Sequence, residues 1–224
     1  QASGERDALA SARLLAPMVR PRVFGVGLNY VAHIREAKAA TPRIPMLFMK
    51  PDTAVIGPDE PIVYPREGKV IHYEAELAVV IGRPARRVPE RLALEYVLGY
   101  TCANDVSERV IQGEEMSLGC LLVGKGFDTF CPIGPVIATD IDPGNLRVVA
   151  RLNGEVRQDS NTSDLLFSVP QLVSYLSQSI TLLPGDVIIT GTPAGVGTIQ
   201  PGDTVEIEVE GIGVLRNPVV AESE

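Results

Sequence analysis

Two glutamates with one residue between them, Glu74 and Glu76, open the apolar stretch at residues 74–81. Successive side chains of a β-strand point to opposite faces, so in a strand these two carboxylates share one face. If both were buried they would repel each other, and a divalent cation would relieve that repulsion. The alternative is a half-exposed strand whose glutamates lie in water. The spacing alone leaves both interpretations open.

Asp105 lies just beyond a second apolar stretch, residues 97–103, which has the length and composition of a strand. The end of a strand often carries functional residues, so this carboxylate is a candidate for a site. An isolated aspartate in this position is also a common N-cap, here for a helix predicted at residues 108–116. The two roles are compatible.

His33 and Glu36 are three residues apart in a helix predicted at residues 29–38, so they can share one face. A carboxylate beside an imidazole raises the basicity of the imidazole, which suits a general base. The alternative is a surface pair that stabilises the helix by a few tenths of a kcal/mol.

Two further candidates involve glycine-rich sequence. Lys125 stands between two glycines in an apolar neighbourhood, where it would stabilise an enolate or a carboxylate; the alternative is a solvated surface lysine. Residues 191–197 follow a strand, and their glycines would let backbone N–H groups approach an anion, although the segment also suits a simple turn. Residues 25–30 are not a dinucleotide-binding loop, because Tyr30 stands where the third glycine is needed.

The elements that must position these residues are mostly strands. Strand patterns occur at residues 23–27, 46–49, 74–81, 97–103, 136–139, 146–152, 187–190 and 204–209. Asn153-Gly154 predicts a hairpin. Helices are expected at 29–38, 89–94 and 108–116, and after a capping box formed by Ser168 and Gln171. We expect one β-dominated domain over residues 21–224, preceded at 1–20 by a weak helix or linker.

The composition excludes several classes of protein. A net charge of −8 argues against a nucleic-acid partner, and no apolar run is long enough to span a membrane. The chain contains 3 cysteines and no CxxC motif, so a cysteine-based zinc site and a disulfide framework are excluded. Residues 1–20 also lack the apolar core of a signal peptide. We expect free thiols and a cytoplasmic location, with the mitochondrial matrix as the alternative.

Seven segments between residues 23 and 218 carry motifs whose order along the chain is informative. They are GVGLNYVAHIREA, PMLFMKP, HYEAELAVVIG, GYTCANDVSER, GKGFDTFCPIGP, the stretch from LNGEVRQDSNTSD to GTPAGVG, and PGDTVEIEVEGIG. In this order the sequence closely resembles the fumarylacetoacetate hydrolase family. The resemblance is to its short single-domain branch of acylpyruvate hydrolases and oxaloacetate decarboxylases.

The resemblance implies a mixed, β-dominated (α+β) fold, in which a rolled β-sheet carries short flanking helices, and a homodimer. It implies that Glu74, Glu76 and Asp105 bind Mg²⁺ or Mn²⁺, which agrees with the shared strand face and with hard oxygen ligands. His72 is then a neighbour of the metal site and not a ligand. Larger members carry an additional N-terminal domain, of which residues 1–20 resemble at most the tail.

The same resemblance implies roles for the remaining candidates. His33 and Glu36 match a catalytic dyad on a lid-like segment, and Lys125 matches a residue that stabilises the enolate. The matching substrate contacts are Gln112, Thr192, Gly191, Lys50 and Arg109. Residues 113–124 are more apolar than in many relatives, which implies a different pocket wall.

These roles imply an enzyme that acts on small 2-keto or 2,4-diketo acids. We expect metal-dependent hydrolysis of the carbon–carbon bond of an acylpyruvate resembling fumarylpyruvate, through a pyruvate enolate. The alternatives are an oxaloacetate decarboxylase or tautomerase, or a 2-hydroxyhepta-2,4-diene-1,7-dioate isomerase of aromatic-acid catabolism. A non-catalytic metal- or ligand-binding protein with this fold would be marked by loss of His33 or Glu36, and both are present.

Overall fold

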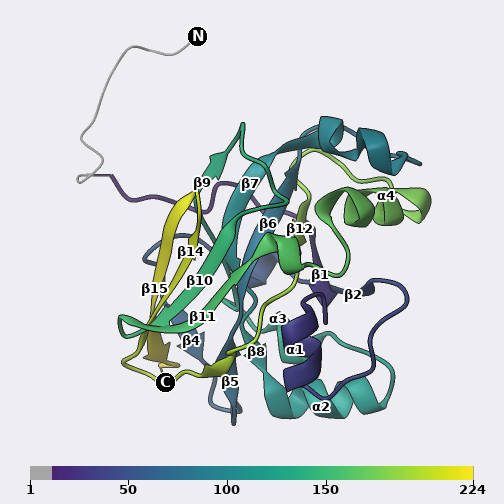
Figure 1. Cartoon of the computed structure of the whole chain (residues 1–224). Coiled ribbons are helices and arrows are strands. Elements are labelled where there is room, and N and C mark those ends of the chain that lie inside the picture. Colours follow the sequence, from purple (N-terminus) through teal and green to yellow (C-terminus); the bar gives the residue numbers. More distant parts are fainter. Residues whose placement is uncertain (1–11, 224) are drawn as a thin grey trace.

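The computed structural model of the chain describes residues 12–223, in which strands dominate (Figure 1). The structure confirms the predicted mixed, β-dominated fold, a curled sheet structure with short flanking helices. Residues 12–20 contain no helix, and residues 1–11 of the predicted N-terminal extension lie outside the described residues. No helix in the described part is long and apolar enough to cross a bilayer.

The strands of the described residues form three sheets. The order in the largest is β2 (Met46–Lys50), β1 (Val23–Gly27), β12 (Val187–Ile189), β6 (Ala75–Ile81), β7 (Val97–Asn104), β9 (Cys131–Ala138) and β3 (Val55–Ile56). The second sheet contains β11 (Glu155–Asn161), β10 (Arg147–Leu152), β14 (Thr204–Val209), β15 (Gly213–Ala221) and β4 (Ile62–Tyr64). A small third sheet joins β13 (Gly197–Thr198), β5 (Ile71–Tyr73) and β8 (Ser107–Glu108).

β6 is buried along its whole length because both of its faces are covered. Leu77 and Val79 pack into a core cluster that includes residues of β10 and β14. Ala78 and Val80, on the opposite face, belong to a second cluster with residues of β1, β2 and β12. Glu76 shares the face of this second cluster. The half-exposed strand that the sequence left open is therefore wrong, since neither face of β6 meets water.

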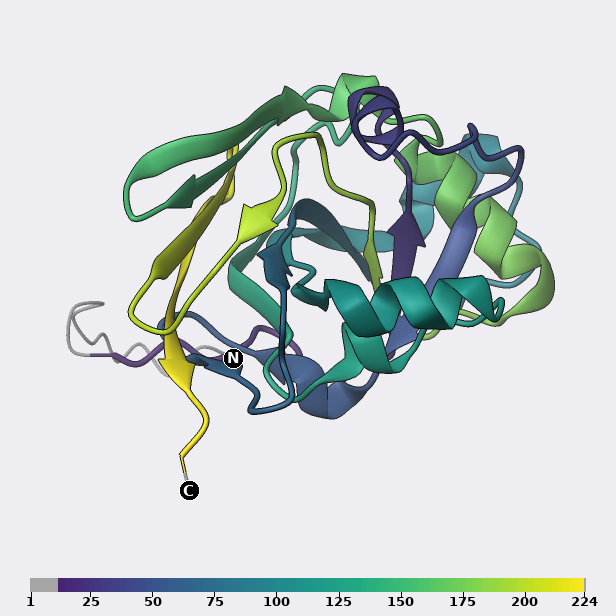
Figure 2. The same ribbon diagram turned by 90° about the horizontal axis from the view of Figure 1, so that it is seen from below.

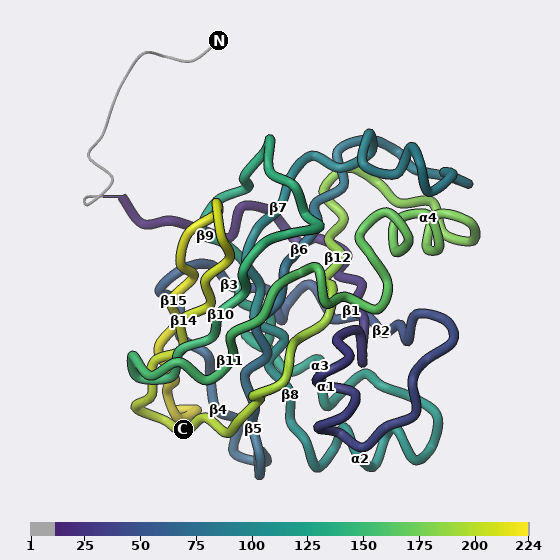
Figure 3. Tube along the Cα trace, viewed as in Figure 1, coloured from purple at the N-terminus to yellow at the C-terminus, as the bar shows by residue number. Residues whose placement is uncertain are grey.

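The helices gather on the side of the molecule away from β14 and β15 (Figures 2 and 3). They are α1 (Val31–Glu36), α2 (Arg109–Ser117), α3 (Val123–Gly126) and α4 (Val169–Ser179), with 3-10 turns η2 (Asp52–Ala54), η3 (Glu90–Tyr96) and η4 (Thr162–Asp164). The capping box predicted from Ser168 and Gln171 begins α4. Glu108, and not Asp105, caps α2, so the N-cap alternative for Asp105 is wrong.

The eight predicted strands are present, most with shifted ends, and the Asn153-Gly154 turn joins β10 to β11 as expected. The sequence patterns missed β3, β4, β5, β8, β13 and β15. β15 escaped because Asn217 and Pro218 interrupt its apolar alternation. The Asn217 amide is buried in the structure, where it donates to the carbonyl oxygens of Gly57 and Glu60 (both 2.9 Å).

The three cysteines are free thiols, as predicted from their number and spacing. Cys102 and Cys131 are buried, and burial raises the pKa of each thiol to about 12. Both therefore stay protonated near neutral pH and serve as small apolar residues of the core.

Candidate active site

The three carboxylates predicted to hold a metal meet where β6 begins and β7 ends. These strands are antiparallel, with Ala75 opposite Asn104, so the residues that flank this pair are neighbours. The Asp105 N–H donates to the Glu74 carbonyl oxygen (2.9 Å), and the Glu74 N–H donates to Oδ1 of Asn104 (2.9 Å). Glu76 lies two residues further along the chain, in β6. The strand register therefore brings Asp105 to the pair of glutamates.

The donor set fits a divalent cation. Ligand oxygens of Glu74, Glu76 and Asp105 all lie within 4.8 Å of one another, and the three residues are buried. Burial raises the pKa of Glu76 well above its ordinary value, and the charges of Asp105 and Glu74 raise it further. A cation of charge +2 would relieve this repulsion, and hard oxygen ligands without sulfur suit Mg²⁺ or Mn²⁺.

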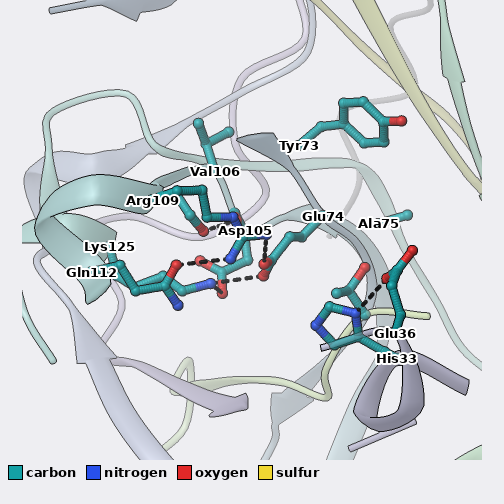
Figure 4. Close-up of polar contacts among 12 residues, drawn as sticks. His33, Glu36, Tyr73, Glu74, Ala75, Asp105, Val106, Arg109, Gln112 and Lys125 are labelled. Carbon is teal, nitrogen blue, oxygen red and sulfur yellow. Dashed lines mark hydrogen bonds and ion pairs between the residues drawn. The ribbon is translucent and has the colours of Figure 1, made fainter. Parts of the chain in front are cut away.

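Lysine and arginine side chains pair with two of these carboxylates, Glu74 and Asp105, in the structure (Figure 4). Lys125 Nζ donates to Glu74 Oε2 (2.7 Å) and to Asp105 Oδ2 (2.6 Å). Lys50 Nζ donates to Asp105 Oδ1 (2.5 Å), and Arg109 Nη2 donates to Glu74 Oε1 (2.5 Å). Burial alone would raise the pKa of Glu74, but Arg109 and Lys125 outweigh it, and the pKa is lowered. Lys125 is only 3% exposed, so the alternative of a solvated surface lysine is wrong.

A cavity of about 530 Å³ opens onto the carboxylates, and residues of α1 and α2 line it. It unites most of the predicted site: His33, Glu36, Glu74, Glu76, Arg109, Gln112, Lys125 and Thr192. Lys50, Asp105 and Gly191 lie behind this lining. Lys50 supports Asp105, and the Gly191 N–H donates to Glu76 Oε2 (2.6 Å). The structure thus places Lys50 and Gly191 against the metal-site carboxylates, and neither of them on the cavity wall.

The His33–Glu36 pair stands at the edge of the cavity on α1 (Figure 4). His33 Nδ1 and Glu36 Oε2 are 3.0 Å apart, which fixes the orientation of the imidazole. The other carboxylate oxygen of Glu36 accepts from the Gly195 N–H (3.0 Å). Glu36 therefore connects α1 to the glycine-rich loop at residues 191–197, and the second imidazole nitrogen of His33 remains available to substrate or water.

His72 also lines the cavity, close to the carboxylates. Its Nδ1 atom is buried without a hydrogen-bond partner. Burial, followed by the positive charge of Arg109, lowers the pKa of His72 to about 4, so the ring is neutral near pH 7. His72 contributes no atom to the group of candidate metal ligands. This agrees with the expectation that His72 lies beside the metal site and is not a ligand.

The sequence patterns gave no role to Gln158, which positions the glycine-rich loop. Its side-chain amide donates to Thr192 Oγ1 (2.8 Å) and to the Pro193 carbonyl oxygen (2.7 Å), and its Oε1 accepts from the Ala75 N–H (2.9 Å). Gln158 thus ties the loop to the start of β6, beside Glu74 and Glu76. It stands in the otherwise largely exposed strand β11, so no hydrophobic pattern marks it.

Comparisons with known proteins decide the family. The family model for the fumarylacetoacetate (FAA) hydrolase C-terminal domain matches residues 22–220. The chain belongs to the fumarylacetoacetate hydrolase family. The resemblance inferred from the sequence motifs is confirmed, and it covers nearly the whole described chain.

Relatives within the fumarylacetoacetate hydrolase family carry several activities in their names. The structure of 5-carboxymethyl-2-hydroxymuconate delta-isomerase from Mycobacterium smegmatis is 50% identical, with a TM-score of 0.91 over 99% of this chain and 87% of that chain. The mitochondrial oxaloacetate tautomerase FAHD2A of Bos taurus is 43% identical, over 92% of this chain and 69% of the relative. Fumarylpyruvate hydrolase from Pseudomonas aeruginosa, solved with Mn²⁺ and pyruvate, is 33% identical, with a TM-score of 0.87 over 96% of this chain and 100% of that chain.

Glu115 is a second residue that sequence reasoning missed in this family member. Its carboxylate, on α2, accepts from the backbone N–H groups of Leu122 (3.1 Å), Val123 (2.7 Å) and Gly124 (3.0 Å). These groups begin α3, the helix that carries Lys125. Burial opposes the ionised form of Glu115, but the three N–H groups outweigh burial and lower its pKa. Glu115 therefore fixes the backbone from which Lys125 reaches the carboxylates.

We expect Glu115→Ala to lower the free energy of unfolding by about 1–2 kcal/mol, because three N–H groups lose a charged acceptor. Glu115→Gln should lose less, since its carbonyl oxygen still accepts. A lowered folded-state pKa means that the contribution is complete above the ordinary value of 4.5 and declines as the pH falls through the folded-state pKa. Urea denaturation at pH 7 and at pH 3 would measure both effects. Glu114→Ala, at the exposed neighbouring position, is the control, and equal stability of the two alanine variants would contradict this role.

Proposed function

We propose that this chain is a divalent-metal-dependent hydrolase that cleaves the carbon–carbon bond of an acylpyruvate. The observation that carries the proposal is that an oriented imidazole, His33, lines the same cavity as the buried carboxylates of Glu74 and Glu76. A general base and an oxygen-rich cation site are the two components that hydrolysis of a 2,4-diketo acid requires. The solved fumarylpyruvate hydrolase with Mn²⁺ and pyruvate supports both the metal class and the product.

Glu74, Glu76 and Asp105 would hold Mg²⁺ or Mn²⁺. When bound, such an ion supplies Lewis-acid stabilisation of negative charge on the 2-keto oxygen of the substrate. Thr192 and Gln112 line the cavity and would orient the substrate carboxylate. Lys125 would supply a further positive charge for the enolate, because its ammonium lies at the carboxylate end of the cavity.

His33 would accept a proton from water while Glu36 holds the imidazole in place. The hydroxide so formed adds to the C4 carbonyl carbon. The C3–C4 bond then breaks, its electron pair passes to the pyruvate enolate, and a carboxylic acid leaves. Protonation of the enolate at C3 gives pyruvate, so one water is consumed for each bond broken.

A second candidate function is conversion of oxaloacetate by tautomerisation or decarboxylation. The observation that favours it is the bovine oxaloacetate tautomerase, which is 43% identical to this chain. Tautomerisation and decarboxylation use the same cation site and the same enolate, but neither needs an activated water. The isomerase structure at 50% identity favours a third activity of the same kind, proton transfer within a hydroxy-dienedioate.

One assay panel separates these activities. With Mg²⁺ or Mn²⁺ present, we expect acetylpyruvate to be hydrolysed at least about tenfold faster than oxaloacetate is decarboxylated, since hydrolysis uses the His33 base and decarboxylation does not. EDTA should abolish turnover, and added metal should restore it. Release of pyruvate and acetate is measured by chromatography, with oxaloacetate tautomerisation followed by absorbance. Exclusive conversion of oxaloacetate, or hydrolysis that survives EDTA, would overturn the proposal. Absence of turnover with every keto acid would also overturn it and would support a non-catalytic binding protein.

A further inference from the structure

The inward face of β2 leads away from the carboxylates as a short series of side chains. Lys50 contacts Asp105, and Phe48 and Met46 follow at alternate positions on the same face of the strand. The Phe48 ring centroid is 5.1 Å from Lys125 Nζ, so the apolar part of this face begins directly beside the carboxylate end. Met46 is two residues further away along the strand. Phe48 and Met46 both line the cavity.

Two glycines of β1 make room for these side chains. Gly25 is paired with Phe48, and Gly27 with Met46. A Cβ atom at Gly25 would collide with the Phe48 ring, and one at Gly27 would lie 3.3 Å from the Met46 sulfur. The Gly25-Val26-Gly27 segment, which is not a dinucleotide-binding loop, thus leaves space for the Phe48 and Met46 side chains that line the cavity.

Met116 of α2 and Leu121 of the α2–α3 connection add further apolar side chains to this lining. Met116 is 44% exposed, so it stands at the solvent side of the cavity. Residues 113–124, whose apolar character stands out in the sequence, therefore contribute apolar wall at this place. The small side chains of Ala37 and Ala39 complete the lining near α1.

The positive charges of the cavity are confined to its other end. Lys125 and Arg109 line the cavity, and both are already paired with the metal-site carboxylates. Arg35, Lys38 and Arg43, in and after α1, are exposed and outside the cavity lining. A second carboxylate at the far end of a substrate would therefore be desolvated among methionine and phenylalanine side chains without a cation to pair with.

On the basis of the proposed function, we infer that Phe48, Met46, Met116 and Leu121 form a subsite for an uncharged, apolar acyl tail. The chain then selects acylpyruvates with alkyl or alkenyl tails over those that end in a carboxylate. This departs from the expectation of a fumarylpyruvate-like substrate that was drawn from the sequence, because fumarylpyruvate ends in a second carboxylate.

Binding tests the subsite independently of turnover. 2-Oxohexanoate and 2-oxoadipate differ only by a methyl group in place of the distal carboxylate. With saturating Mn²⁺, calorimetry should show about tenfold tighter binding of 2-oxohexanoate by the parent protein, reflecting the unpaired carboxylate of the other ligand. Met116→Lys should reduce or reverse this ratio. Met49→Lys is the matched control: Met49 is similarly exposed, at 43%, but does not line the cavity, so the ratio should not change.

A matched substrate pair gives the second measurement. Crotonoylpyruvate is fumarylpyruvate with a methyl group in place of the terminal carboxylate, and we expect it to have the higher kcat/KM. A parent protein that binds 2-oxoadipate as well as 2-oxohexanoate would overturn the inference, as would a ratio that Met116→Lys leaves unchanged. If both acylpyruvates resist hydrolysis while 2-oxohexanoate still binds preferentially, the proposed reaction fails and the apolar subsite stands.

Discussion

Glu76→Gln should abolish metal-dependent turnover while the protein remains folded. Glutamine preserves the volume of this buried side chain, and its carbonyl oxygen can still accept the Gly191 N–H that Glu76 Oε2 accepts at 2.6 Å. What it removes is one of three negative charges around the cation site. We expect the affinity for Mg²⁺ or Mn²⁺ to fall at least about 10²-fold, because the loss of a direct ligand exceeds the loss of a residue that only supports one.

Calorimetric titration with Mn²⁺ measures this affinity directly, and circular dichroism with thermal denaturation shows whether the variant folds. Glu95→Gln is the control, because Glu95 is exposed on η3, away from the cavity. Unchanged Mn²⁺ affinity in Glu76→Gln would rule out Glu76 as a ligand. A loss of activity with unchanged affinity would give Glu76 a role in substrate binding instead.

How far the sequence could predict this site is clearest at the carboxylates. A strand period of two places Glu74 and Glu76 on one face, whatever else the chain does. The period does not say whether water or protein covers that face, so both the cation site and the half-exposed strand stayed open. The burial of β6 on both faces decides between them, and it depends on the second sheet and on β1, β2 and β12.

Asp105 and Lys125 show a different limit. Asp105 is 31 residues beyond Glu74 in the sequence, and only the pairing of β6 with β7 makes their backbones neighbours. Lys125 looks like a surface lysine in its local sequence, yet its ammonium lies between two buried carboxylates. Residue patterns marked both as candidates, with an ordinary structural role left open for each, and the family resemblance supplied their roles in the site.

Gln158 and Glu115 were missed because their partners are distant in the sequence or lie in segments without a hydrophobic pattern. Gln158 contacts the glycine-rich loop 34 residues away at Thr192, and its neighbours in β11 are polar. Glu115 caps N–H groups of a connection whose sequence is apolar and suggests a helix or loop equally well. Such side-chain-to-backbone hydrogen bonds leave no periodic signal, so they become visible only with the fold.

His33→Ala should separate hydrolysis from the reactions that need only the enolate. A general base contributes about 10²–10⁴-fold to a reaction that activates water, so acylpyruvate hydrolysis should fall by that factor. Oxaloacetate decarboxylation should fall much less, since the carboxylate cluster and Lys125 are untouched by the change. Arg35→Ala, an exposed position on the same helix, is the control and should affect neither rate.

The comparison of the two rates in His33→Ala is more informative than either alone. The His33–Glu36 pair contacts the glycine-rich loop through Gly195. The pair therefore has two candidate roles, as a base or as a structural link (a clasp) that holds α1 against that loop. A clasp orders the cavity for every substrate, and its loss would lower both rates equally. A base acts on water, and its loss is selective. Equal losses would therefore reject His33 as the base and assign it to positioning. A selective loss of hydrolysis would support its role as the base, and Glu36→Gln should then show the same selectivity more weakly.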